Sequence, residues 1–275
     1  MPMKKTKIIT FANQKGGVGK TTFATTVAVA LALRGLKILV IDLDPQASAG
    51  RAFRIEESPG IMNLLMNDIS RPAIRQMVKE MVEKPRPRVD DRQPPTWVEN
   101  VDVLPGDKRT SLVRDSFQGQ DHLPLLRTRI EQVFGDSGYD YIILDTSPSV
   151  GGIQEPAVWA ADYLMVPVTP EQGAYDGLRK LLDDADAMAR LKGELKWRGT
   201  LLGVILNEYE ENKALSAQIL SALKNHFQDH LLGPVHRTTY FPQASGAGLT
   251  IFEWDPNGRA VKEYNQIVDF ILRAR

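Results

Sequence analysis

The chain has 275 residues, of which 43% are hydrophobic and 25% are charged. Positive and negative side chains number 34 each, so the formal net charge is zero and provides no overall attraction to DNA or to a membrane surface. There is no cysteine, which excludes disulfides, thiolate metal sites, iron–sulfur clusters and a cysteine nucleophile. This length and composition are typical of one α/β domain with a hydrophobic core.

The start of the chain does not resemble a targeting signal. Its lysines lead directly into a strand-like segment, without the apolar stretch and cleavage site of a signal peptide. No run of residues approaches the roughly 18 apolar residues that a membrane span requires. We therefore expect a soluble, cytoplasmic protein. Because the first strand begins at 7–10, we expect no helix-turn-helix domain before it.

Two periodicities alternate along the first fifty residues. A short β-branched run at 8–11 precedes a glycine-rich turn, and a helical pattern then extends from Thr21 to Leu33 and ends at Gly35. The continuous apolar segment 37–41 is typical of a strand that is buried on both faces of a parallel sheet. These fifty residues predict a β-loop-α-β unit.

The same alternation continues along the chain. Further strands are predicted at 101–105, 141–144, 163–168 and 201–206, with helices near 74–82 and at 177–191, 214–227 and 260–275. Strands that alternate with helices predict a doubly wound, mostly parallel sheet with its ligands at the carboxyl ends of the strands. Neither an internal repeat nor a second core pattern is evident, so we expect a single domain over 1–275.

One segment interrupts the pattern. Residues 84–95 contain four prolines and six charged side chains. This composition predicts an exposed loop between the helix near 74–82 and the strand at 101–105. An insertion that binds a partner is the alternative.

The strongest chemical signal lies between the first strand and the first helix, where the chain reads Lys-Gly-Gly-Val-Gly-Lys-Thr-Thr. Glycines let successive backbone N–H groups turn toward phosphate oxygens, and a helix N-terminus adds positive potential. A terminal lysine pairs with the outer phosphates, and the following hydroxyl ligates magnesium. The residues expected to bind nucleotide are Gly16, Gly17, Val18, Gly19, Lys20, Thr21 and Thr22.

A second lysine stands at the mouth of this loop. The general pattern has glycine at position 14, where this chain has Gln14, and Lys15 follows it. Two lysines at one phosphate group would repel each other. We therefore expect Lys15 to point elsewhere than Lys20.

Three carboxylates follow predicted strands. Asp145 ends an apolar strand, where an unpaired charge is costly, so a magnesium ion or water is its expected partner; a simple strand-end cap is the alternative. Asp42 and Asp44 end a neighbouring strand two residues apart, so their side chains are expected on one side. For these two, capping of the following turn is the alternative.

These motifs, in this order, resemble the deviant Walker A ATPases of the ParA/MinD family. The resemblance implies a P-loop NTPase fold and an ATPase that needs ATP and Mg²⁺ and hydrolyses slowly without a partner. It covers most of the chain and is weakest around 84–95. The segments that carry it are 13–22, 42–46, 143–149, 166–171 with 177–178, and 246–253 with Pro256, Ala260 and Tyr264.

The resemblance also implies individual roles. Lys15 would be the signature lysine, which reaches across an ATP-bridged homodimer to the phosphates of the other subunit. Asp44 would orient or activate the attacking water, and Asp42 would support the metal shell. Asn207, which follows the strand at 201–206, would read adenine, with a turn residue as the alternative. A second adenine contact is expected near His236, where the sequence departs from the family.

Three functions compete within the resemblance. A ParA-type partition or positioning ATPase binds nonspecific DNA as an ATP dimer, associates with the nucleoid, and releases DNA when a ParB-like or cargo-adaptor protein stimulates hydrolysis. A MinD-like regulator binds the membrane through an additional amphipathic helix, but 260–275 carries a core-packing stripe and no such helix follows. A metabolic or metal-delivery relative is the third, and iron–sulfur carriers need cysteines. We expect the first, with no membrane partner.

Direct evidence for DNA contacts is weaker. From residue 237 onward the chain has five positive and four negative side chains. A patch of this size predicts weak phosphate contacts that a dimer would double, with scattered solvated charges as the alternative. The candidate DNA contacts are Arg237, Arg259, Lys262 and Arg273.

Overall fold

The structure is a computed structural model that describes residues 6–58, 60–66, 70–83, 99–112, 123–148, 153–173, 177–179, 199–247 and 249–274. In these residues the chain forms a seven-stranded parallel sheet with strand order β3-β2-β4-β1-β5-β6-β7. The prediction of a doubly wound parallel sheet is confirmed. The predicted loop at 84–95 and most of the predicted helix at 177–191 lie outside the described residues.

The predicted strands occur within a residue or two of their expected bounds. β7, which is two residues long, was not expected, and it pairs with the last part of β6. The strands are β1 (Lys7–Phe11), β2 (Ile38–Asp42), β3 (Val101–Leu104), β4 (Tyr141–Asp145), β5 (Tyr163–Val168), β6 (Thr200–Leu206) and β7 (Leu231–Leu232).

The helices predicted at 21–33, near 74–82, at 214–227 and at 260–275 are also present, whereas several short helices have no periodicity long enough to predict them. The helices are α1 (Lys20–Ala32), α2 (Ser48–Ala52), α3 (Gly60–Met66), α4 (Arg71–Glu83), α6 (Leu125–Phe134), α7 (Gln154–Ala160), α9 (Ala214–Phe227), α10 (Tyr240–Gly246), α11 (Ile251–Trp254) and α12 (Arg259–Arg273), with a 3₁₀ turn at Gln228–His230.

Side-chain alternation along β1 divides the core into two layers. Ile9 and Phe11 pack on the side of α1 and α12, whereas Ile8 faces the layer that contains α3, α4, α6 and α7. On the first side, Phe23 of α1 stacks between Phe11 and Tyr264 of α12. The chain start, the helix after the phosphate loop and the chain end therefore share one core.

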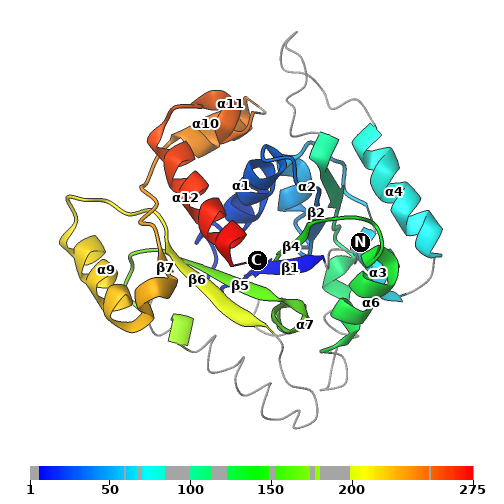
Figure 1. Ribbon diagram of the computed structural model, residues 1–275, viewed down its shortest axis with the longest axis horizontal. Coiled ribbons are helices and arrows are strands. Elements are labelled where there is room, and N and C mark those ends of the chain that lie inside the picture. The colour runs from blue at the N-terminus through cyan, green and yellow to red at the C-terminus, as the bar shows by residue number, and fades with distance from the viewer. Residues whose placement is uncertain are drawn as a thin grey trace.

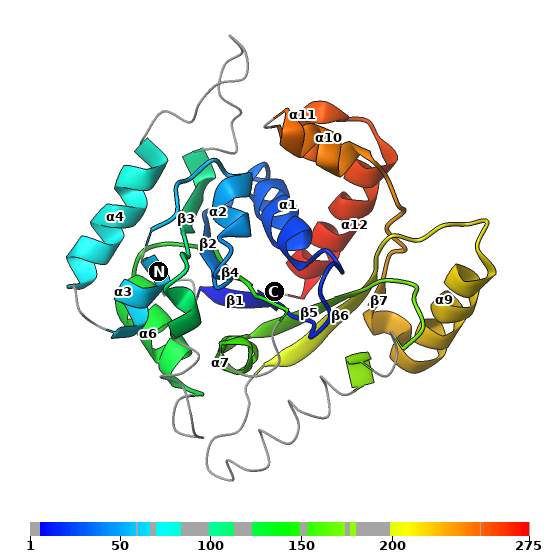
Figure 2. The ribbon, with the colours of Figure 1, turned by 180° about the vertical axis from the view of Figure 1, so that it is seen from behind.

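The ribbons show how the helices surround the sheet (Figures 1 and 2). In both views α10 and α11 lie beside α12 and α1, α9 lies beside β7 at one edge, and α3, α4 and α6 lie at the β3 edge. Residues of α1 and α10 line the cavity that is described below with the candidate site.

A buried ion pair connects β5 to α6 and β1. The guanidinium of Arg127 donates to Asp162 Oδ1 at 3.1 Å and to the carbonyl of Ala160 at 2.9 Å, while Asp162 Oδ2 accepts from the Ile8 amide at 2.8 Å. The two charged side chains are only 13% and 12% exposed. A buried carboxylate with this many donors is held firmly.

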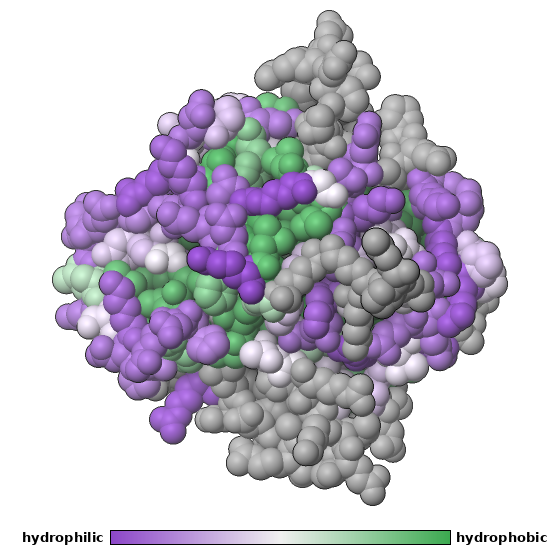
Figure 3. Space-filling model, in the orientation of Figure 1, coloured by the Kyte–Doolittle hydropathy of each residue, from purple (hydrophilic) through white to green (hydrophobic). Residues whose placement is uncertain are grey.

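Apolar side chains on the face shown in Figure 3 gather near its middle, where Figure 1 places α1 and α12, and polar residues border them. Large hydrophobic side chains that are at least 40% exposed are Leu33, Met66, Leu112, Leu215, Tyr240 and Trp254. Within the ranges that the structure describes, every helix is too short or too polar to cross a membrane.

Candidate nucleotide site

The carboxyl ends of three neighbouring strands meet at the site. In the register of the sheet, Phe11 at the end of β1 and Asp42 at the end of β2 both pair with Asp145 at the end of β4. The glycine-rich loop leaves β1 at this point and continues into α1. Strand register therefore brings the predicted phosphate loop and the predicted metal carboxylates together.

The phosphate loop adopts a conformation that requires glycine at two positions. The backbone φ angle is +75° at Gly17 and +95° at Gly19, in the left-handed region that favours glycine. A Cβ atom on Gly19 would lie 2.6 Å from Nδ2 of Asn207, so the Asn207 side chain would have to move to admit it. No side chain caps the start of α1, so its first N–H groups point toward the loop, as anion binding requires.

Lys20 is buried at the base of the loop. Its ammonium group donates a hydrogen bond to the carbonyl oxygen of Lys15 at 2.9 Å. Burial lowers the pKa of Lys20, and the negative charges of Asp145 and Asp44 act in the opposite direction. A desolvated ammonium group gains most from strongly charged acceptors, and phosphate oxygens are such acceptors.

Asp145 is fully buried, and neither carboxylate oxygen has a hydrogen-bond partner among the described residues. Burial raises the pKa of Asp145 well above its usual range, the charge of Asp42 raises it further, and the nearby Thr21 hydroxyl lowers it. Buried oxygens without donors fit a divalent cation, which needs oxygen ligands and supplies positive charge. The residues present therefore fit the predicted magnesium site.

Asp42 is buried at the end of β2, and both of its carboxylate oxygens accept hydrogen bonds from backbone amides. Its Oδ1 accepts a hydrogen bond from the Asp44 amide at 3.0 Å, and its Oδ2 accepts one from the Gly50 amide of α2 at 2.9 Å. Burial raises the pKa of Asp42 to about 6. Both oxygens thus hold backbone, as the turn-capping alternative predicts. Asp42 thus fixes the loop that carries Asp44. Its support of the metal shell stays a prediction, because a carboxylate oxygen that accepts one hydrogen bond keeps a second lone pair.

Asp44 is half-buried and lies in the loop between β2 and α2. Its Oδ1 accepts a hydrogen bond from the Gln46 amide at 2.9 Å, so Asp44 also caps the turn. Its negative charge raises the pKa of Asp145 and opposes the lowering of the pKa of Lys20. Its role in orienting the attacking water stays a prediction.

Sequence reasoning missed a glycine that supports this loop. A Cβ atom on Gly106, just after β3, would lie 2.9 Å from the carbonyl oxygens of both Asp42 and Asp44. The absence of a side chain lets the β3 loop pack directly against the Asp44 loop. The sequence signal was a Pro-Gly pair after a strand, which indicates only a turn.

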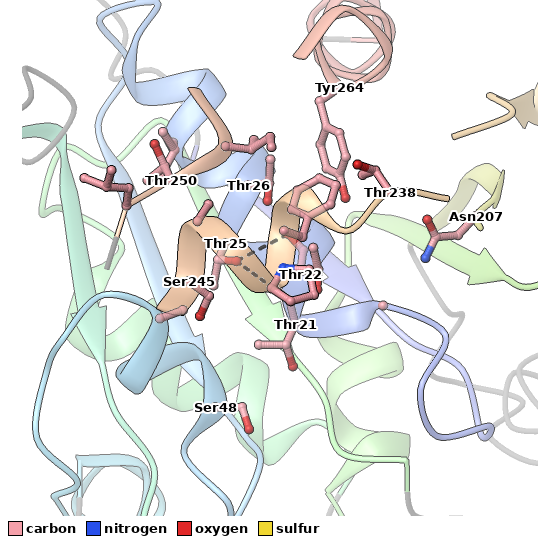
Figure 4. A pocket seen from close by; sticks show the side chains of 18 of the residues that line it. Thr21, Thr22, Thr25, Thr26, Ser48, Asn207, Thr238, Ser245, Thr250 and Tyr264 are labelled. Atoms are coloured by element: carbon pink, nitrogen blue, oxygen red, sulfur yellow. Dashed lines mark hydrogen bonds between the residues drawn. The ribbon is translucent and has the colours of Figure 1, made fainter. Parts of the chain in front are cut away.

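A cavity of about 630 Å³ adjoins the phosphate loop (Figure 4). Threonines of α1 line one wall, Ser48 of α2 and Ser245 of α10 also line the cavity, and Asn207 lies at the side away from Ser245. The Nδ2 of Asn207 donates to the Val18 carbonyl at 3.0 Å. The cavity thus joins the phosphate loop to the predicted adenine residue. The hydroxyl side chains on its α1 wall are Thr21, Thr22, Thr25 and Thr26.

His236, near the expected second adenine contact, also lines this cavity. Its ring stands edge-on to Tyr209, with 5.2 Å between centroids. Nδ1 of His236 lies 2.6 Å from a Glu263 oxygen, and Nε2 lies 2.6 Å from Nη2 of Arg259. The ring is therefore fixed by protein groups on both nitrogens.

Two of the four candidate DNA contacts are paired with acids in the structure. Arg237 donates to Glu210 at 3.1 Å, and Arg259 donates to Glu211 at 2.7 Å and to Glu263 at 3.0 Å. Linear charge counting from residue 237 could not detect this, because two of these acids precede that residue. DNA phosphates would have to compete with these carboxylates.

The other two candidates, Lys262 and Arg273, are exposed on α12. They are eleven residues apart, which is about three helical turns, so they lie on the same side of the helix. Asp269 lies on that side between them and pairs with Arg34 of α1 at 2.8 Å. The face is mixed in charge and not a continuous basic stripe.

Lys15 points away from the position of Lys20, as its charge predicts. Its ammonium group forms an ion pair with Glu171, just after β5. Because β5 and β4 flank β1 on opposite sides, this contact lies across β1 from Asp145. The sequence included Glu171 in a matching segment but did not indicate any role for it.

Comparisons with known proteins agree on one family. Residues 6–196 match a family model described as an AAA domain. The chromosome partitioning protein ParA of Caulobacter vibrioides is 29% identical over 254 residues, which cover 90% of this chain and 87% of that protein.

Two solved structures have the same fold. The structure of Cyanothece McdA with ATP superposes with a TM-score of 0.79 at 20% identity and covers 98% of this chain and 97% of that one. A putative plasmid partition protein of Borrelia burgdorferi bound to AMPPNP gives a TM-score of 0.67 at 25% identity, with 99% and 100% coverage.

Proposed function

Because the chain belongs to this AAA-domain family and to its ParA-type branch, we propose that it is an ATPase that segregates or positions a cargo. In this proposal the ATP-bound form is a homodimer that binds nonspecific DNA, and a ParB-like or cargo-adaptor protein stimulates hydrolysis. The cargo is a plasmid, a chromosome or a protein assembly. The named relatives support partition, and the solved neighbours with ATP and AMPPNP support nucleotide binding.

The observation that carries the proposal is the buried Asp145, whose two carboxylate oxygens have no hydrogen-bond partner among the residues that the structure describes. Thr21 and Asp145 would hold Mg²⁺, directly or through water. The ion supplies neutralisation of charge on the phosphates when it is bound. Lys20, desolvated at the base of the loop, pairs with phosphate oxygens that are delivered against the start of α1.

The remaining residues divide the work of hydrolysis. Asp44 orients the attacking water, and Asp42 fixes the Asp44 loop through the two amides that it accepts from. Asn207 reads adenine at the side of the cavity. Lys15 reaches the phosphates of the partner subunit, a contribution comparable to an arginine finger supplied in trans, which is worth about 10³ to 10⁵ in rate.

For DNA, the exposed Lys262 and Arg273 are the better candidates, because Arg237 and Arg259 must first leave their carboxylates. A single copy with mixed charge on this face binds phosphate weakly, and a dimer doubles the contacts. Affinity for DNA should therefore fall steeply with salt and depend on ATP.

The test is cosedimentation of the full chain with DNA and, separately, with liposomes, each with ATP, with ADP and without nucleotide. We expect binding to DNA with ATP alone. Binding to liposomes instead would select the MinD-like alternative, and equal DNA binding in all three states would reject an ATP switch. In sedimentation velocity Lys15→Gln should remain monomeric with ATP. A Lys15→Gln protein that dimerises there and hydrolyses ATP at the normal rate would reject the trans role.

A further inference from the structure

The contact between Lys15 and Glu171 places the signature lysine on a carboxylate of its own subunit. The two side chains are 40% and 58% exposed, so the pair lies at the surface. Lys15 at the mouth of the loop is thus accessible but engaged. A lysine that must reach another subunit has to leave this carboxylate first.

Both partners are positioned by other residues. Oε1 of Glu171 accepts from the Thr169 hydroxyl at 3.2 Å, and its other oxygen takes the Lys15 ammonium. On the lysine side, Asn13 accepts from the Lys15 amide at 2.9 Å and donates to the Pro167 carbonyl of β5 at 2.8 Å. Asn13 therefore ties the start of the phosphate loop to the strand that leads to Glu171.

The contact is also linked to the nucleotide residues. The Lys15 carbonyl accepts the hydrogen bond from the Lys20 ammonium at 2.9 Å. Phosphates that draw Lys20 toward themselves weaken this bond and so loosen the residue whose side chain is on Glu171. Nucleotide binding and release of the Lys15 side chain from Glu171 are therefore linked through the backbone of Lys15.

We propose that Glu171 holds Lys15 in cis in the monomer and restrains ATP-dependent dimerisation until the lysine exchanges this carboxylate for the phosphates of the partner subunit. This inference rests on the trans role of Lys15 in the proposed function. Glu171 is a positioning residue in this scheme, because it acts through Lys15. The restraint prevents monomers from pairing before both phosphate loops are filled.

The size of the effect follows from the exposure of the pair. Ion pairs exposed to this degree change an equilibrium by up to about fivefold. Each dimer requires the release of two such pairs, one in each subunit. Removing both should lower the dimer dissociation constant by up to about 25-fold.

The test compares Glu171→Gln with wild type by sedimentation velocity over a range of protein concentrations, with AMPPNP and Mg²⁺ so that turnover does not change the populations. Glutamine keeps an acceptor for Thr169 but removes the charge that holds Lys15. The matched control is Asp136→Asn, which removes one acid from an exposed pair with Arg75, in the loop after α6.

We expect Glu171→Gln to dimerise at lower protein concentration, with an unchanged Tm, and Asp136→Asn to behave as wild type. A dimer dissociation constant that is unchanged or higher in Glu171→Gln overturns the restraint, the higher value indicating a contact of Glu171 in the dimer. Failure of the proposed function is separate, because it appears as normal dimerisation of Lys15→Gln.

Discussion

Replacing Asp145 by asparagine should stabilise the nucleotide-free protein while it removes the response to magnesium. The carboxylate is fully buried, lacks hydrogen-bond partners within the described part of the chain, and lies near two further acids. Asparagine has nearly the same shape and removes this uncompensated charge. Charges at functional sites are commonly kept at such a cost to stability.

The magnitude follows from the environment. An uncompensated buried charge costs several kcal/mol, and the nearby Lys20 offsets part of that cost, which leaves a gain of about 1–3 kcal/mol for Asp145→Asn. For a chain of this size each kcal/mol raises Tm by about 2–4 °C, so we expect an increase of about 2–12 °C. With ATP and Mg²⁺ at a hundredfold excess over Kd, the free energy of unfolding of wild type should rise by about 2.7 kcal/mol. Asp145→Asn should lose most of this stabilisation by ligand.

Differential scanning calorimetry, with and without ATP and Mg²⁺, measures both effects. The matched control is Asp162→Asn, because the Asp162 carboxylate has Arg127 and the Ile8 amide as partners. Removing this charge should lower the free energy of unfolding by about 3–5 kcal/mol. A nucleotide-free Asp145→Asn protein that melts below wild type would refute the reasoning, because it would mean that Asp145 has stabilising partners.

Three further outcomes follow from the site. Gly19→Ala should weaken ATP binding at least tenfold, measured by calorimetry, because position 19 has a left-handed φ and the new Cβ would lie 2.6 Å from Asn207. The control Gly246→Ala, whose Cβ would meet nothing within 4 Å, should bind ATP as wild type does. Equal affinities of the two variants would contradict this reasoning. Asp44→Ala should accumulate the ATP dimer with little turnover in a phosphate-release assay, and unchanged turnover would remove Asp44 from the mechanism. The pKa of Asp145 is raised on folding, so the folded state binds more protons above about pH 4 and loses stability as pH rises. The free energy of unfolding in urea should therefore fall more between pH 5 and pH 7.5 for wild type than for Asp145→Asn. Parallel dependence of this free energy on pH in the two proteins would count against the prediction.

The framework of the fold could be predicted because its signals are local. The strands at 37–41 and 141–144 are continuous apolar runs, and such runs become central parallel strands for lack of any exposed face. The helix after the phosphate loop was predicted to within a residue of α1 (Lys20–Ala32). Gly19 stands directly before the helix and Gly35 follows shortly after its end, and both have a positive φ.

The parts that could not be predicted depend on contacts between distant segments. α2 begins after Ala47, which has a φ of +50° without being glycine, so no residue marks its start. The positioning role of Asp42 requires knowledge that Gly50 returns to meet it. The pairing of Arg259 with Glu211 joins residues 48 positions apart, which no charge count along the chain reveals.

The hydrogen bond from Asn207 to the Val18 carbonyl joins the two ends of the candidate nucleotide site. The amide that is proposed to recognise the purine also supports the loop that is proposed to bind phosphate. A side-chain amide has a second N–H donor and an oxygen acceptor, so Asn207 can face a base while it keeps this hydrogen bond. The residue that would recognise the base therefore also shapes the loop that would receive the phosphates.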